Sequence, residues 1–409
     1  MASVGGIYVG GGEGSPNTGE IFFSGICFFL DRIPENSDIN TSISEDWEIE
    51  VNNHQNQIVA RSKKCYDYEE IITHGYDCCQ IFLDLKSVLH HESYLIKNAE
   101  FEYIIVYNEN GSFCVRDVSK SDFIMGSSVS IQILDKDGSA KELPKEEEPK
   151  WIQAFRYYRL SQTDLDIYNA YRNLFLSFES LIDAIFPYVK VGEKNWLIGS
   201  IHKIHKTYPL DSFIPKQYPK GPVDYIIEEQ YEKIRCGLFH AKNRDIIVPL
   251  TKPNPSEILE AYQYLIPIWR HVLTHYKDTL IGGGEMTYDG FRDLMEYFGK
   301  KITKFVVSND PTPIKNDNNC ISPANYTVII GDEIGYDAKY GPGLSLIYGK
   351  ISTSRISEKE YLHRFWFENQ DNLVQLNYRD DGINPKGTER LECYQITRLI
   401  NKNTSKTTF

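Results

Sequence analysis

The residues best suited to chemistry lie in one short run, Arg235-Cys-Gly-Leu-Phe-His240, at the end of an amphipathic stretch. His240 titrates near neutral pH, so it could take the proton of an RNA 2′-hydroxyl or give one to the leaving 5′-oxygen. Arg235 is always cationic, and its planar fork suits phosphate oxygens that gain negative charge in the transition state. Such a reaction needs no metal ion, and it cannot occur on DNA, which lacks the attacking hydroxyl.

The spacing of this pair restricts how a helix could present it. In a continuous α-helix, residues five positions apart lie roughly 140° apart around the axis and about 7.5 Å apart along it. Arg235 and His240 would therefore not share a face. Either Gly237 ends or distorts the helix, or the arginine side chain wraps back, or two copies of the protein share one site. The competing interpretation is a surface arginine beside a histidine that favours a helix end.

Other candidate motifs are weaker. His202 and His205 could approach a metal ion, but no carboxylate or thiol follows at a suitable spacing. His271 and His275 lack the intervening glutamate of a metalloprotease helix, so packing within a bundle is the competing interpretation. The eight cysteines contain no Cys-x-x-Cys, which excludes the common zinc and disulfide patterns and fits a reducing cytoplasm. We therefore expect no metal site and no cofactor.

Three blocks of different pattern must position these residues. Alternating runs predict a β-rich N-terminal domain over 1–145, including a hairpin in which an Asn-Gly turn joins Phe101–Tyr107 to Phe113–Val118. Apolar residues at spacings of three and four predict a helical bundle over 150–281. Strand and turn patterns return over 285–400, after one more helix. The predicted fold class is a multidomain α+β protein, and whether its two β regions pair stays open.

The helical block carries the clearest boundaries. Its four predicted helices cover Leu165–Ile185, Glu193–Tyr208, Pro222–Phe239 and Pro255–Tyr276. A fifth helix is expected over Thr287–Lys301. The charged, proline-bracketed stretch 142–149 predicts a linker, and the tail from Asn401 is expected to fray.

The charge is distributed unevenly along the chain. The 409 residues carry a net charge of −13, which argues against a protein that coats nucleic acid. Residues 151–281, however, hold 16 basic and 14 acidic residues, so the flanks carry the whole negative excess. The longest apolar run, Ile21–Leu30, is too short to span a membrane and follows no basic segment. We expect a cytoplasmic protein without a membrane partner.

The run from Tyr231 to Lys242, which contains the Arg-x4-His pair, resembles the signature of the HEPN superfamily, particularly its ApeA-like branch. The upstream segment Tyr171–Asp183 resembles the family's first bundle helix, which commonly brings a carboxylate towards the motif. The resemblance covers about residues 155–280. It implies a dimer-forming helical bundle and, as in many members, a metal-independent endoribonuclease of defence or toxin systems, with the two motifs facing each other across the dimer.

Carried over to this sequence, the resemblance implies a role for each motif residue. Arg235 would stabilise the phosphate in the transition state, and His240 would be the general acid or base. Glu179 would orient one of them, with Asp183, one turn further on, as its rival. Lys242 and Arg244 could hold the RNA backbone, or they could be solvated loop cations.

The same resemblance predicts partners. We expect RNA, with tRNA among the candidates, a second copy of the chain as a homodimer partner, and an activating trigger or partner on the β-rich flanks. The chain departs from the family pattern at Cys236, where active members often carry Asn, Asp or His. The alternative interpretation is a catalytically inactive HEPN module that docks a partner protein or a nucleotide.

Overall fold

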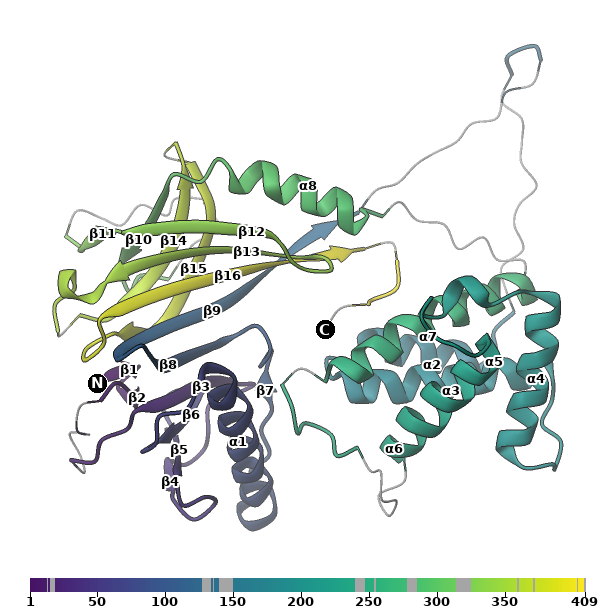
Figure 1. Ribbon diagram of the computed structural model, residues 1–409, viewed down its shortest axis with the longest axis horizontal. Helices are drawn as coiled ribbons and strands as arrows, with labels where there is room; N and C mark the ends of the chain where they lie inside the picture. The colour runs from purple at the N-terminus through teal and green to yellow at the C-terminus, as the bar shows by residue number, and fades with distance from the viewer. Residues whose placement is uncertain are drawn as a thin grey trace. The chain divides into compact units, whose positions relative to one another are not determined.

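The protein has a mixed α+β fold, shown in Figure 1 as a computed structural model. The structure describes residues 1–12, 14, 19–126, 134, 136–139, 150–239, 247–253, 255–277, 285–313, 325–358, 360–370, 372–402 and 404–407. Two compact units are present. The β unit comprises Met1–Phe123, Leu250–Asn254 and Thr287–Leu399, and the helical unit comprises Ile124–Pro249, Pro255–Met286 and Ile400–Phe409. None of the described helices is both long and apolar enough to span a bilayer.

Two sheets make up most of the β unit. The larger sheet contains, in spatial order, β12 (Glu333–Gly341), β13 (Leu344–Ser352), β16 (Arg390–Asn401), β9 (Ser112–Met125), β8 (Tyr103–Glu109), β3 (Ser24–Leu30), β6 (Gln57–Ser62), β5 (Trp47–Val51) and β4 (Asp38–Asn40), with β7 (Ile96–Lys97) beside β3. The smaller sheet contains β11 (Val328–Ile330), β10 (Lys304–Ser308), β14 (Leu362–Asn369), β15 (Asn372–Asn384), β1 (Ala2–Val4) and β2 (Ile7–Gly10). Within the described residues, strands are confirmed in both predicted β regions.

The N-terminal and C-terminal β regions share both sheets. In the larger sheet β16 lies next to β9, and in the smaller sheet β15 lies next to β1. One core joins side chains from the two sheets, among them Val106, Phe365 and Leu391. The two β regions predicted over 1–145 and 285–400, whose pairing the sequence left open, are therefore one unit, because each buries its apolar face against the other.

The predicted hairpin is confirmed. Glu109 of β8 pairs with Ser112 of β9, and the two turn residues Asn110 and Gly111 have φ angles of 55° and 89°. Both angles lie in the left-handed region that the turn of a tight hairpin requires, which explains the Asn-Gly pair.

One long helix of the β unit was not predicted. Helix α1 (Tyr68–His90) lies within the region interpreted as strands, and it packs on the larger sheet through residues such as Phe82 and Cys79. Its start is a capping box: the Asp67 side chain accepts a hydrogen bond from the Glu70 N–H, and the Glu70 carboxylate accepts one from the Asp67 N–H. The residue types at positions 67–70 are therefore a sequence signal for the start of this helix.

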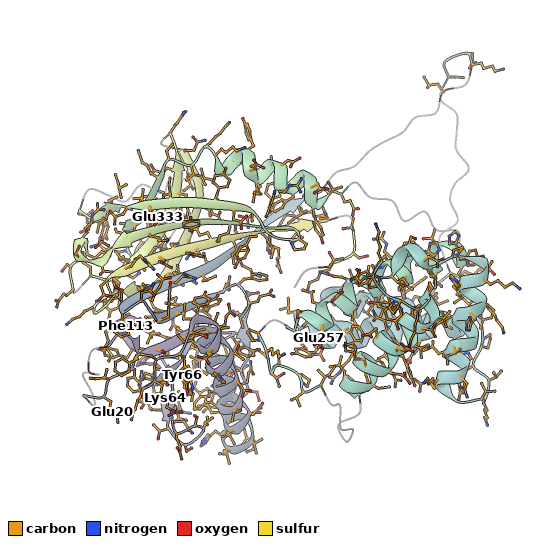
Figure 2. The ribbon with its side chains drawn as sticks, in the orientation of Figure 1. Glu20, Lys64, Tyr66, Phe113, Glu257 and Glu333 are labelled. Atoms are coloured by element: carbon orange, nitrogen blue, oxygen red, sulfur yellow. The ribbon has the colours of Figure 1, made fainter. Side chains whose placement is uncertain are left out.

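The helical unit begins with one helix that was also missed. Its elements are α2 (Gln153–Thr163), α3 (Ile167–Ile185), α4 (Glu193–Thr207), η1 (Asp211–Phe213), α5 (Pro222–Tyr225), η2 (Ile226–Arg235), α6 (Cys236–Phe239) and α7 (Ser256–Lys277). The four predicted helices of this block are confirmed, and α2 precedes them. Figure 2 shows their side chains, with Glu257 in the first turn of α7. The fifth predicted helix is α8 (Tyr288–Gly299) of the β unit, which also contains η3 (Thr353–Arg355).

The C-terminal tail was expected to fray, but its described residues 404–407 are held by hydrogen bonds. Arg270 Nη1 of α7 donates a hydrogen bond of 3.0 Å to Ser405 Oγ, and Lys406 Nζ donates one of 2.7 Å to the Asp164 carbonyl. Side chains of α7 and backbone groups after α2 therefore hold this segment on the helical unit. The expected linker over 142–149 lies outside the described residues.

Candidate functional site

Helix α3 supplies one side of the candidate site. Asp166 begins it, because its carboxylate accepts hydrogen bonds from the N–H groups of Tyr168 and Asn169, both at 3.1 Å. The apolar stripe of α3 is buried, including Phe175, Phe178 and Ile182. Glu179 lies beside this stripe rather than on the solvent face, so its carboxylate is held against the neighbouring helices.

The segment that leads to Arg235 is π-helical. Element η2 (Ile226–Arg235) forms wider turns than an α-helix, and the N–H of Cys236 donates to the carbonyl of Tyr231, five residues back. Buried Tyr171 of α3 donates to the Gln230 carbonyl and side chain, both at 2.8 Å. Gln230 Nε2 in turn donates to the Ala261 carbonyl of α7 at 3.0 Å. These buried bonds fix η2 between α3 and α7 just before Arg235.

Arg235 lies between two carboxylates. Its Nη2 atom is 2.6 Å from Glu193 Oε1 of α4 and 3.3 Å from Glu179 Oε1 of α3. The centres of the Tyr231 and Phe239 rings lie 5.1 Å and 5.0 Å from the guanidinium carbon. The arginine side chain is only 11% exposed. A cation is thus held in a small aromatic and acidic enclosure.

The electrostatics of this cluster are unbalanced. Burial raises the pKa of Glu179 to about 7; Arg235 partly opposes this effect, while the neighbouring Glu193 carboxyl adds to it. Burial alone would lower the pKa of Arg235, but the two carboxylates raise it above its ordinary value. Glu179 therefore exchanges a proton near neutral pH, a property that is common in functional sites.

Glu193 reaches the site from the start of another helix. It is the first residue of α4, where a negative charge is favourable, and it follows Gly192, whose φ of 87° needs a glycine. Beside it, Lys194 forms an ion pair with Glu232 of η2. Two adjacent residues of α4 thus contact η2, although 42 positions separate Glu193 from Arg235.

Arg172 is a second cation near the motif, and sequence reasoning missed it. Its Nη2 donates a hydrogen bond of 2.7 Å to the Leu238 carbonyl, and its guanidinium lies 5.9 Å from the Phe239 ring. Within the described part of the chain, Arg172 forms no ion pair. Arg172 lies two helical turns before Glu179 on the same face of α3. This spacing in the sequence could have indicated that Arg172 lies near the motif. The hydrogen bond of Arg172 holds α6 at Leu238, two residues before His240 in the sequence.

The structure brings together only part of the predicted site. Glu179 meets Arg235 as the resemblance led us to expect, whereas its rival Asp183 accepts a hydrogen bond of 2.7 Å from the Tyr188 N–H at the end of α3. The remaining predicted site residues lie outside the described residues: His240, Lys242 and Arg244.

The paired histidines of α7 pack against aromatic rings. His275 stacks on Tyr208 with 4.4 Å between ring centres, and His271 lies 4.5 Å from Phe213. Among the residues with a described placement, no group of three or more His, Cys, Asp or Glu side chains could hold a metal ion. These contacts support the packing interpretation of the pair.

No family model, no curated protein and no solved structure matches this chain. Its function is therefore interpreted from its own residues and their geometry.

Proposed function

We propose that this protein is a metal-independent endoribonuclease of the HEPN type that acts on RNA in the cytoplasm as a homodimer. One observation carries the proposal: in a helical unit, the motif arginine Arg235 meets the carboxylate of Glu179 from a neighbouring helix. The pair lies at the end of a π-helical segment, and such segments are frequent at functional sites. His240 follows Arg235 after one further turn of chain.

The proposed reaction is an internal transfer of the phosphate. His240 takes the proton of the 2′-hydroxyl, the 2′-oxygen attacks the adjacent phosphorus, and the bond from phosphorus to the 5′-oxygen breaks. A protonated histidine gives its proton to the 5′-oxygen. In the dimer, this histidine is His240 of the second copy's motif. The products are a 2′,3′-cyclic phosphate and a 5′-hydroxyl, so atoms and protons balance.

Arg235 would stabilise the negative charge that develops on the phosphate oxygens. The raised pKa of Glu179 matters for this role, because a partly protonated carboxyl neutralises the guanidinium less than an ionised one would. Arg172 would act indirectly, since its hydrogen bond to the Leu238 carbonyl positions the chain just before His240.

The alternative is a non-catalytic module that docks a partner protein or a nucleotide. It is favoured by the two carboxylates on Arg235, which occupy the donor that a phosphate would need, and by Cys236 directly after the arginine. In that case the cluster would hold η2 to α3 and α4 and would perform no chemistry.

The deciding experiment is cleavage of tRNA and total RNA by the full chain in EDTA. We expect R235A and H240A each to lose activity by roughly 100-fold or more, the usual effect of removing a donor or a proton-transfer group. Matched controls are H202A, an exposed histidine of α4, and R292A, a partly exposed arginine of α8; both should cleave normally.

End-group analysis should find 2′,3′-cyclic phosphates, and 2′-O-methyl RNA should stay intact. If no RNA is cut, even with nucleotides or candidate partner proteins added, the binding module becomes the better description.

A further inference from the structure

We propose that Glu193 is an internal competitor of the substrate phosphate: it occupies Arg235 in a closed state and must leave before RNA binds. The inference rests on the proposed function, because it describes the regulation of the same site. It assigns a role to a residue that no sequence motif marks, and it explains why the motif arginine is held between two carboxylates.

The first argument is the shared donor. Glu193 Oε1 and Glu179 Oε1 both approach the same nitrogen, Arg235 Nη2, and the Glu193 contact is the shorter, at 2.6 Å against 3.3 Å. A phosphate oxygen is recognised by the same guanidinium donors as a carboxylate oxygen. The Glu193 carboxylate therefore holds the place that a substrate phosphate would need.

The second argument is the difference in burial between the two carboxylates. The Glu179 side chain is 16% exposed and extends from the middle of α3, so it cannot leave without disturbing the packed helix. The Glu193 side chain is 44% exposed, and Glu193 is the first residue of α4. The Glu193 carboxylate can therefore leave Arg235 and be hydrated by water instead. Glu179 stays in place and remains the ion-pair partner of the buried guanidinium.

The third argument is how weakly the start of α4 is held to η2. Besides Glu193, the contact between these elements includes the Lys194–Glu232 ion pair, whose side chains are about half exposed. Exposed pairs of this kind contribute little and weaken with salt. Trp196 and Leu197 bury the following turn of α4, so Glu193 leaves Arg235 by rotation of its own partly exposed side chain and not by movement of the helix.

The fourth argument is charge. With both carboxylates ionised, the cluster carries one positive and two negative charges, and it repels a phosphate. Once Glu193 has left, the remaining Arg235–Glu179 pair is neutral or, when Glu179 is protonated, positive. Movement of Glu193 thus removes the net repulsion of the phosphate, in addition to freeing a donor.

The test compares E193Q with E229Q in the full chain. Glu229 is a partly exposed residue of η2 that pairs with Lys233 at 3.2 Å, so E229Q changes the net charge equally without touching Arg235. The probe is a 2′-O-methyl RNA oligonucleotide, which binds without being cut, and cleavage of the unmodified RNA is followed in parallel. We expect E193Q to bind the probe about tenfold more tightly, with a lower KM, while E229Q stays near wild type.

The gain must also depend on Arg235, so R235A combined with E193Q should bind no better than R235A alone. Unchanged or weaker probe binding by E193Q would overturn the competitor role and make Glu193 a residue that positions Arg235. Tighter binding without any cleavage in all proteins would support the competitor role and refute the nuclease. Absence of probe binding in every protein would overturn both proposals.

Discussion

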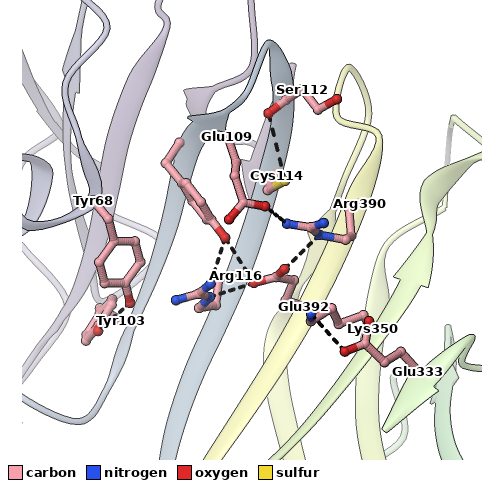
Figure 3. A network of polar contacts seen from close by, with 11 residues as sticks. Tyr68, Tyr103, Glu109, Ser112, Cys114, Arg116, Glu333, Lys350, Arg390 and Glu392 are labelled. Atoms are coloured by element: carbon pink, nitrogen blue, oxygen red, sulfur yellow. Dashed lines mark hydrogen bonds and ion pairs between the residues drawn. The ribbon is translucent and has the colours of Figure 1, made fainter. Parts of the chain in front are cut away.

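Each unit of the molecule contains arginines in contact with glutamates, and the two arrangements differ. Figure 3 shows the arrangement in the β unit, where the Glu392 side chain is 1% exposed. Its carboxylate forms ion pairs with Arg116 Nε at 2.6 Å and with Arg390 Nε at 2.7 Å. Arg390 also pairs with Glu109. The guanidinium of Arg116 lies 4.1 Å from the Tyr394 ring. Two cations meet two carboxylates, and aromatic rings cover the arrangement.

The helical unit has one cation for two carboxylates, Glu179 and Glu193, and one of these is partly exposed. The balanced network connects β8 and β9 of the N-terminal region with β16 of the C-terminal region. In the unbalanced cluster, burial and, to a smaller extent, Glu193 raise the pKa of Glu179, and the Glu193 side chain is partly exposed. Balance and burial indicate a structural connection, whereas imbalance and partial exposure indicate a site where one carboxylate can give way to another anion.

The largest effect should come from removing one charge of the balanced network. We expect E392Q to destabilise the β unit by about 3–5 kcal/mol, because Arg116 and Arg390 lose their common buried partner. Hydrogen exchange of the β9 and β16 amides, read by mass spectrometry, measures this loss locally. The matched change E193Q should cost less than about 1 kcal/mol in the helical unit, since that pair is partly exposed.

An equal loss in E392Q and E193Q would remove the distinction between the two arrangements. A large loss of RNA cleavage in E392Q protein that remains folded would do the same, because it would connect the β network to the chemistry.

A second, smaller effect concerns pH. The folded-state pKa of Glu179 is about 7, above its ordinary value of 4.5, so the folded protein binds this proton more tightly than the unfolded chain does. The resulting stabilisation is fully present below pH 4.5 and is lost as the pH rises through 7. We expect a change of roughly 1–3 kcal/mol across this range in the wild type and a flatter profile in E179Q.

Urea unfolding of both proteins at several pH values, followed by tryptophan fluorescence, measures the difference. Parallel profiles would show that Glu179 titrates as an ordinary carboxyl and that the cluster is less unbalanced than its geometry indicates.

The smallest effect tests how the π-helical segment is held. Y171F removes the hydroxyl that donates to Gln230, and we expect a loss of about 1 kcal/mol, the usual net value of one buried hydrogen bond. Faster hydrogen exchange should be confined to the amides of η2 and its neighbours. Y188F, at an exposed tyrosine, is the control. If Y171F slows cleavage without changing stability, Tyr171 contributes to positioning Arg235 rather than to folding.

Local patterns account for the successful sequence predictions. The apolar spacing of three and four predicted α3, and the Asn110-Gly111 turn predicted the hairpin, because both signals are complete within one segment. The start of α1 was also encoded locally, in the Asp67–Glu70 capping box, but the strand patterns around it dominated the interpretation. The expectation that Glu179 orients Arg235 or His240 came from a family resemblance, and the structure places Glu179 in contact with Arg235.

The sequence alone determined most of the helical and extended segments, although α1 and α2 were missed, and which arginine and carboxylate are candidates for chemistry. Only the tertiary structure decided that the two β regions form one unit and that Glu193 contacts Arg235 from across 42 positions. The physical reason is the same in both cases. Periodicity and capping depend on neighbours along the chain, whereas strand pairing and ion pairing between helices depend on which faces are buried together.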